Sequence, residues 1–139
     1  MDSLPKLSKK VNLAIKEYIE EYTEEHRNIC DIDLSYDLHV LRETLYQEET
    51  ACEKVLNNLI LPLDDLEGVV WGCFVNANWT LSIIVQSLKT NKRITCECGP
   101  QDIKIYSVNT YSVFSQEYSI EEAEKILPKC VNWIKEYDV

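Results

Sequence analysis

Apolar side chains recur at intervals of three and four residues in the first part of the chain, which is the spacing of one face of an α-helix. The first such run covers residues 4–22, and Ser3 can cap it. A second run begins after Ser35 and stops at Pro62, since proline ends or kinks a helix. An acidic patch at residues 47–50 leaves open whether this run is one long helix or two short ones.

The next segment, residues 68–88, contains no charged residue over 21 positions. A membrane span is not expected there, because Asn76, Asn78 and Gln86 interrupt the segment and charged stretches flank it. A helix that is apolar on all sides is otherwise one that other helices enclose. We therefore predict residues 66–88 to be the central hydrophobic helix of a bundle.

Residues 90–118 carry a mixed pattern. Ile94, Cys96 and Cys98 alternate as the residues of a strand do, whereas Ile103 and Tyr106 also fit the spacing of a helix. We expect a loop followed by a short helix in this segment, with a β-hairpin as the alternative.

Ser119 and Glu122 have the spacing of a capping box, and apolar residues follow at helical intervals. This pattern predicts a helix over residues 120–137, bent at Pro128. Taken together, the elements predict an all-α fold in which residues 1–139 form a single domain, a helical bundle around a central hydrophobic helix.

The composition is that of a globular chain, with 45% hydrophobic and 27% charged residues and a formal net charge of -10. Neutralising phosphates requires surplus lysine and arginine, so nucleic acid and anionic lipid are not expected as ligands. The charge favours partners that are basic, apolar or both.

Candidate chemistry is sparse. The two imidazoles, His26 and His39, lie in polar stretches without a nucleophile motif nearby, and Cys96 and Cys98 lack the second pair of ligands that a structural zinc site uses. Six cysteines without a secretory signal indicate reduced thiols in the cytoplasm. We therefore expect a protein that is not an enzyme and that binds no cofactor and no metal.

Two of the three glycines, Gly68 and Gly72, fall at the start of the expected central helix. A glycine inside a helix costs about 1 kcal/mol relative to alanine, so close packing must require it. Either another helix crosses at this point, or the glycines form the floor of a groove that a bound chain approaches.

The segment Gly68-Val69-Val70-Trp71-Gly72-Cys73 resembles the first homology motif of the Bcl-2 family, and Trp133-Ile134 resembles the core of its second motif. The order of the expected helices is also similar. The resemblance implies a compact viral pro-survival homologue of the poxvirus or iridovirus type, which would act in the cytosol of the host cell. Cys73 stands where the family has the arginine that pairs with the aspartate of a bound death ligand. Arg42 and Lys54 are the nearest replacement cations.

The resemblance further implies an inhibitor of apoptosis that holds the amphipathic death-motif helix of a pro-apoptotic protein in a hydrophobic groove. The expected partner is a Bim-type death ligand, with Bak, Bax or a second copy of the chain as further partners. The expected groove residues are Leu41, Arg42, Leu45, Leu59, Leu63, Val70, Gly72, Cys73, Phe74 and Ala77.

Two alternatives stay open. One keeps the Bcl-2-like fold as a scaffold that modulates innate-immune signalling. The other is an acidic immunity protein that neutralises a basic nuclease toxin, for which the support is the net charge of -10.

Overall fold

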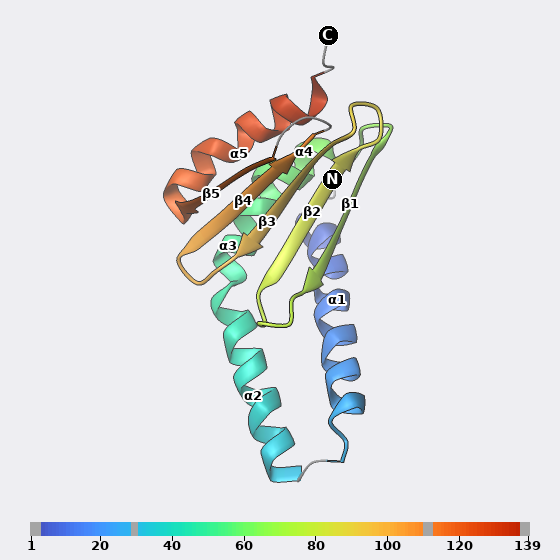
Figure 1. Ribbon diagram of the computed structural model, residues 1–139, viewed down its shortest axis with the longest axis vertical. Helices are drawn as coiled ribbons and strands as arrows, with labels where there is room; N and C mark the ends of the chain where they lie inside the picture. The colour runs from blue at the N-terminus through green and yellow to red at the C-terminus, as the bar shows by residue number, and fades with distance from the viewer. Residues whose placement is uncertain (1–3, 29–30, 110–112, 137–139) are drawn as a thin grey trace.

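The computed structural model describes residues 4–28, 31–109 and 113–136 (Figure 1). The first half is helical: α1 (Leu4–Glu25), α2 (Asp31–Gln47), α3 (Glu49–Val55), the π-helical turn η1 (Leu56–Ile60) and the short α4 (Leu61–Leu63). The second half holds the strands β1 (Val69–Val75), β2 (Leu81–Ser87), β3 (Lys92–Cys98), β4 (Asp102–Val108) and β5 (Val113–Ser119), followed by helix α5 (Ile120–Lys135).

The five strands form one antiparallel sheet, and each strand pairs with its neighbour in sequence, in the order β1-β2-β3-β4-β5. Helices α3 and α5 and the turn η1 pack behind the sheet, whereas the face toward the viewer in Figure 1 carries no helix of the described chain. Helix α1 packs along β1. The fold therefore has two layers, one of strands and one of helices, and an open sheet face.

The expectation of an all-α bundle is wrong, because residues 66–88 contain β1, a turn and β2 instead of a central helix. An uncharged segment is compatible with a buried helix or with buried strands, and the lack of charge does not distinguish them. Ile83, Ile84 and Val85 are β-branched and favour a strand, and the chain reverses near Trp79, whose φ is 64°. In residues 90–118 the loop and short helix are also wrong, since β3, β4 and β5 occupy the described part of that segment.

The predicted first and last helices are confirmed as α1 and α5, although Ser3 lies outside the described residues. Ser119 caps α5: its Oγ accepts the N–H of Glu122 at 3.2 Å, and its own N–H donates to Glu122 Oε1 at 3.4 Å. The second helical run starts at Asp31 and is interrupted at Glu48, so it forms two helices.

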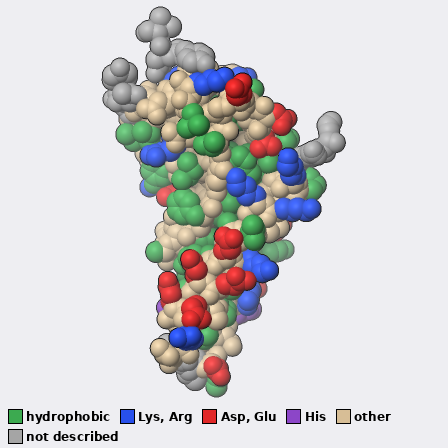
Figure 2. Space-filling model, turned by 90° about the vertical axis from the view of Figure 1, so that its right-hand side faces the viewer, with side chains coloured by type: hydrophobic (Ala, Val, Ile, Leu, Met, Phe, Trp, Pro, Cys, Tyr) green, Lys and Arg blue, Asp and Glu red, His purple; other side chains and the backbone are tan. Residues whose placement is uncertain are grey.

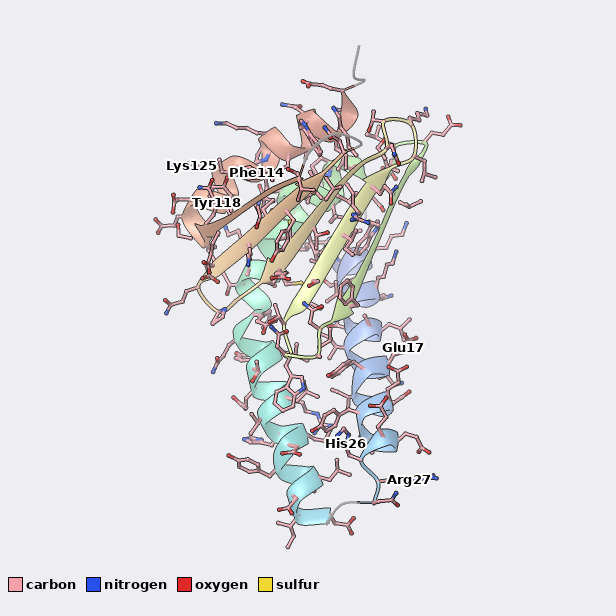
Figure 3. All side chains as sticks on the ribbon, in the orientation of Figure 1. Glu17, His26, Arg27, Phe114, Tyr118 and Lys125 are labelled. Atoms are coloured by element: carbon pink, nitrogen blue, oxygen red, sulfur yellow. The ribbon has the colours of Figure 1, made fainter. Side chains whose placement is uncertain are left out.

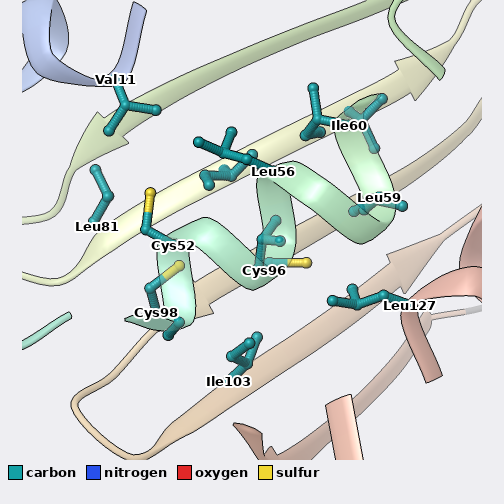
Figure 4. Packing of buried hydrophobic residues seen from close by; sticks show 14 of the residues in the cluster. Val11, Cys52, Leu56, Leu59, Ile60, Leu81, Cys96, Cys98, Ile103 and Leu127 are labelled. Carbon is teal, nitrogen blue, oxygen red and sulfur yellow. The ribbon is translucent and has the colours of Figure 1, made fainter. Parts of the chain in front are cut away.

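The core lies between the sheet and the helices (Figure 4). Alternate residues of the inner strands point into it because a strand places successive side chains on opposite faces. The strands contribute Leu81, Ile83, Val85, Ile94, Cys96, Cys98, Ile103 and Ile105. The helices contribute, among others, Cys52, Leu56, Leu59, Ile60 and Leu127.

A buried lysine joins the sheet to the end of α5. Lys92 is 2% exposed, and its Nζ donates to the carbonyl oxygens of Trp133 at 2.9 Å and Glu136 at 2.8 Å. A cation there satisfies the terminal carbonyls of the helix and complements the negative end of its dipole.

Candidate binding surface

The expected groove residues do not come together. Four of them belong to the helical half of the chain and are buried in the core: Leu41, Leu45, Leu59 and Leu63. Four other expected groove residues lie on β1, where successive side chains point to opposite faces of the sheet. Val70, Gly72 and Phe74 point to the open face, whereas Cys73 points toward the helices, and Ala77 is exposed in the turn before β2.

The residues of the two motif-like segments lie in a turn, a strand and the end of a helix, and they do not form a common groove. Gly68 adopts a positive φ of 82° in the turn before β1, and Trp71 Nε1 donates to Asp64 Oδ1 at 3.1 Å. A Cβ at Gly72 would meet no atom within 4 Å, so neither a helix crossing nor a tight backbone explains this glycine. Trp133 and Ile134 lie in the last turn of α5, with Ile134 in the core.

The most distinctive surface is an arm that projects past the sheet. The second half of α1 and the first half of α2 extend beyond the turn between β1 and β2 (Figure 1). We call residues 17–28 and 31–43 the acidic arm. They carry nine Asp and Glu residues against Arg27 and Arg42, and most of these carboxylates are exposed.

Aromatic contacts hold the arm to the sheet. The ring of Trp79, from the β1–β2 turn, meets the ring of Tyr22 edge-on, with centroids 6.0 Å apart. The Tyr22 hydroxyl donates to Asp37 Oδ2 at 3.2 Å, which ties α1 to α2. The His26 ring stacks on the Tyr22 ring, with centroids 4.0 Å apart. The arm is therefore fixed at its base and presents its outer sides to solvent.

The carboxylates of α1 are arranged unfavourably for the isolated helix. Glu17 and Glu21, and Glu20 and Glu24, are four residues apart, a spacing at which like charges on a helix repel. They also approach the C-terminal end of α1, where the helix dipole is negative and the last turn holds no basic residue. Figure 2 shows the acidic side chains gathered on the narrow lower part of the molecule.

Internal compensation of this charge is slight. Within residues 17–28 and 31–43 the structure gives one ion pair, between Arg27 and Glu24 at 2.8 Å, and both side chains are largely exposed. An exposed pair of this kind contributes at most about 1 kcal/mol. The folded protein therefore keeps a concentrated negative field on the arm.

A pocket of about 310 Å³ opens at the base of the arm, between α1 and the α2–α3 region. Its wall is apolar, and charged side chains stand at its edge. Of the expected groove residues it brings together Arg42 and Leu45, and the other lining residues include Val11, Ile15, Cys52, Leu56, Leu81, Glu49 and Glu53. The pocket is therefore a partly apolar hollow at the place where the arm joins the core.

Glu48 connects this region to the sheet. It occupies the interruption between α2 and α3, is 3% exposed, and its Oε1 accepts the N–H of Leu81 at 2.7 Å. Burial raises the pKa of Glu48 to about 7, and the bond from Leu81 partly opposes this shift. A carboxyl group titrating near neutrality thus lies where the arm joins the core.

The described cysteines are buried or half-buried free thiols. Burial raises the pKa of Cys52 to about 12, and it also raises the pKa of Cys96 and Cys98 above the ordinary value of a thiol. These sulfurs are therefore protonated and weakly nucleophilic. Among the described residues no three potential metal ligands lie close enough together to hold an ion. Cys30 lies outside the described residues.

Sequence reasoning missed the residues that shape this surface. The glutamates of α1 belong to runs that are usually solvated faces, yet their repetition at intervals of four was visible in the sequence. Trp79 and Glu48 carried no such signal, because their partners, Tyr22 and Leu81, are distant in sequence.

Comparisons with known proteins found no family model, no curated protein and no solved structure that matches this chain. No helix in the described residues is both long enough and apolar enough to cross a membrane. The function is therefore inferred from the surface itself.

Proposed function

We propose that this protein is a non-catalytic binding protein whose acidic arm covers a basic surface of a protein partner. The partner class that fits best is a nucleic-acid-acting protein such as a nuclease, because a surface built to hold phosphates also attracts a cluster of carboxylates. Binding of this kind would block access of the nucleic acid, as an immunity protein does.

One observation carries the proposal: the glutamates of α1 repel one another and the helix dipole, and the fold offers little to relieve them. Such an arrangement lowers the stability of the free protein. A basic partner would neutralise the repulsion, so the same charges that destabilise the monomer would contribute to affinity and to fast association.

The prediction of an apoptosis inhibitor is untested as a function, but the geometry gives it no support. Its groove required Leu59 and Phe74 on one surface, and they lie on opposite sides of the sheet. The regulation of innate-immune signalling relied on the same helical fold. The acidic-inhibitor alternative does not depend on that fold.

The test compares two variants with the same change in net charge. The arm variant combines Glu20→Gln, Glu21→Gln and Glu24→Gln. The control variant combines Asp65→Asn, Glu67→Gln and Glu136→Gln, which are exposed acids outside the arm. Partners are captured at low salt from the cells that produce the protein, identified by mass spectrometry, and their affinities measured with the purified proteins.

We expect a basic partner whose affinity falls about tenfold in the arm variant, since three exposed charge pairs at about 0.5 kcal/mol each amount to one decade. The control variant should bind within about twofold of wild type. The arm variant should also be more stable than wild type in urea, because it lacks the repulsion. Equal losses in both variants, or a partner without a basic surface, would refute the proposal.

A further inference from the structure

The two edges of the sheet differ in how their backbone is protected. At one edge, the even-numbered residues of β1 bond to β2, as the bonds from Leu88 N–H to Gly68 O and from Asn76 N–H to Thr80 O show. The N–H and C=O groups of Trp71 and Cys73 therefore point away from β2. Helix α1 lies over this edge. Lys10 Nζ donates to Trp71 O at 2.6 Å, so α1 covers this edge and binds one of its outward carbonyl groups.

The other edge, β5, is open. Ile120 N–H donates to Gln101 O, and this pair continues the β4–β5 register in which Asp102 faces Ser119. Because hydrogen-bonded pairs alternate along an antiparallel ladder, the even-numbered residues of β5 bond to β4. The N–H and C=O groups of Val113, Ser115 and Glu117 consequently point outward. In the part of the chain that the structure describes, nothing bonds to them.

The strand β5 also lacks the usual devices that prevent pairing at an edge. It is seven residues long, pairs with β4 without a bulge, and contains neither proline nor lysine. Glu117 is its one charged residue. Val113 and Phe114 are 71% and 47% exposed, which leaves apolar side chains beside the open backbone.

We propose that two copies of the chain pair antiparallel through β5 and form a continuous ten-stranded sheet. In such a dimer, residues whose N–H and C=O groups point outward must face one another across the two β5 strands. The twofold axis must therefore pass through a residue and not between two residues. An axis at Glu117 would place two carboxylates in opposition, which disfavours it. An axis at Gln116 places Phe114 opposite Tyr118 of the second copy and Ser115 opposite Glu117.

The axis at Gln116 is favoured by its side-chain pairs. Phe114 and Tyr118 lie on the same side of β5, toward α5 (Figure 3), so the two aromatic pairs of the dimer share one face. They occupy non-hydrogen-bonded positions, where side chains of opposite strands approach most closely. Ser115 and Glu117 then exchange backbone hydrogen bonds on both sides of the axis. The strand is thus complementary to itself.

Sedimentation velocity across a concentration series tests the association. Wild type should pass from the chain mass of 16.2 kDa to twice that mass. Ser115→Pro removes an outward N–H that the monomer does not use, so the variant should fold and stay monomeric. Ser115→Ala keeps the N–H and should dimerise like wild type, which separates the backbone bond from the side chain.

A cysteine pair tests the register. In the proposed dimer the Cα atoms of the two Gln116 residues lie about 4.5 Å apart, a separation that a disulfide can span. Gln116→Cys should therefore form a covalent dimer under mild oxidation, and Ser115→Cys should not do so above the wild-type level. A wild type that remains monomeric at all concentrations, or a dimer that persists in Ser115→Pro, would overturn the proposal. Neither result bears on the acidic arm.

Discussion

Neutralising Glu48 should stabilise the protein at neutral and alkaline pH but not in acid. Glu48 is nearly inaccessible to solvent, and its Oε1 accepts the N–H of Leu81 at 2.7 Å. The substitution Glu48→Gln keeps an oxygen acceptor for this N–H and removes the ionisable group. Glu49→Gln, at the exposed neighbouring position, is the matched control.

The magnitude follows from linkage between protonation and folding. Burial raises the pKa of Glu48 from its ordinary value of 4.5 to about 7 in the folded protein. Between these two values the unfolded chain has lost the proton that the folded chain retains, so the contribution of Glu48 lowers stability as pH rises. Each pKa unit corresponds to about 1.4 kcal/mol, and the full penalty, complete above pH 7, is about 3 kcal/mol.

The assay is urea unfolding of wild type and both variants at pH values from 4 to 8. Subtracting wild type from Glu48→Gln at each pH removes the contribution of the other titrating groups. We expect a difference near zero at the acidic end that grows to about 3 kcal/mol in favour of the variant above pH 7. Glu49→Gln should differ from wild type by the same small amount at every pH.

A pH-independent difference for Glu48→Gln would refute the reasoning, because it would mean that the carboxyl group ionises in the folded protein as it does in the unfolded chain. A variant less stable than wild type at pH 8 would have the same consequence. It would show that the ionised carboxylate is better accommodated at this position than a neutral amide.

Three further outcomes are expected. Gly72→Ala should raise the free energy of unfolding by about 0.5–1 kcal/mol in urea titrations, because the added Cβ meets no atom and the unfolded chain loses freedom; a destabilised variant would contradict this. Lys92→Met should cost about 1.5–3 kcal/mol and speed amide exchange at the end of α5, because Trp133 and Glu136 lose a charged donor to their carbonyls; unchanged exchange there would count against the capping role. Iodoacetamide at pH 8 should leave Cys96 and Cys98 unmodified in the native protein and label them after unfolding, as followed by mass spectrometry. Rapid labelling of either thiol in the native protein would contradict this and show that the core opens readily.

The elements with local signals could be predicted from the order of residues alone. The spacing of apolar residues defined α1 and α5, and Ser119 with Glu122 marked the start of α5, because a helix and its cap are built from residues within a few positions of one another. The excess of acidic residues and the weakness of any catalytic or metal-binding motif were also evident without coordinates.

The secondary structure of the uncharged segment and the contacts between distant residues depend on the packing of the whole chain. Residues 68–88 carry no charge because they are partly buried, and a buried helix and a buried hairpin meet that condition equally well. The choice depended on pairing: β2 finds partners in β1 and β3, so its alternate residues face the core. The same long-range packing placed Glu48 against Leu81, set Trp79 against Tyr22, and left the acidic arm and the edge of β5 exposed. Such contacts join residues far apart in sequence, and no local pattern encodes them.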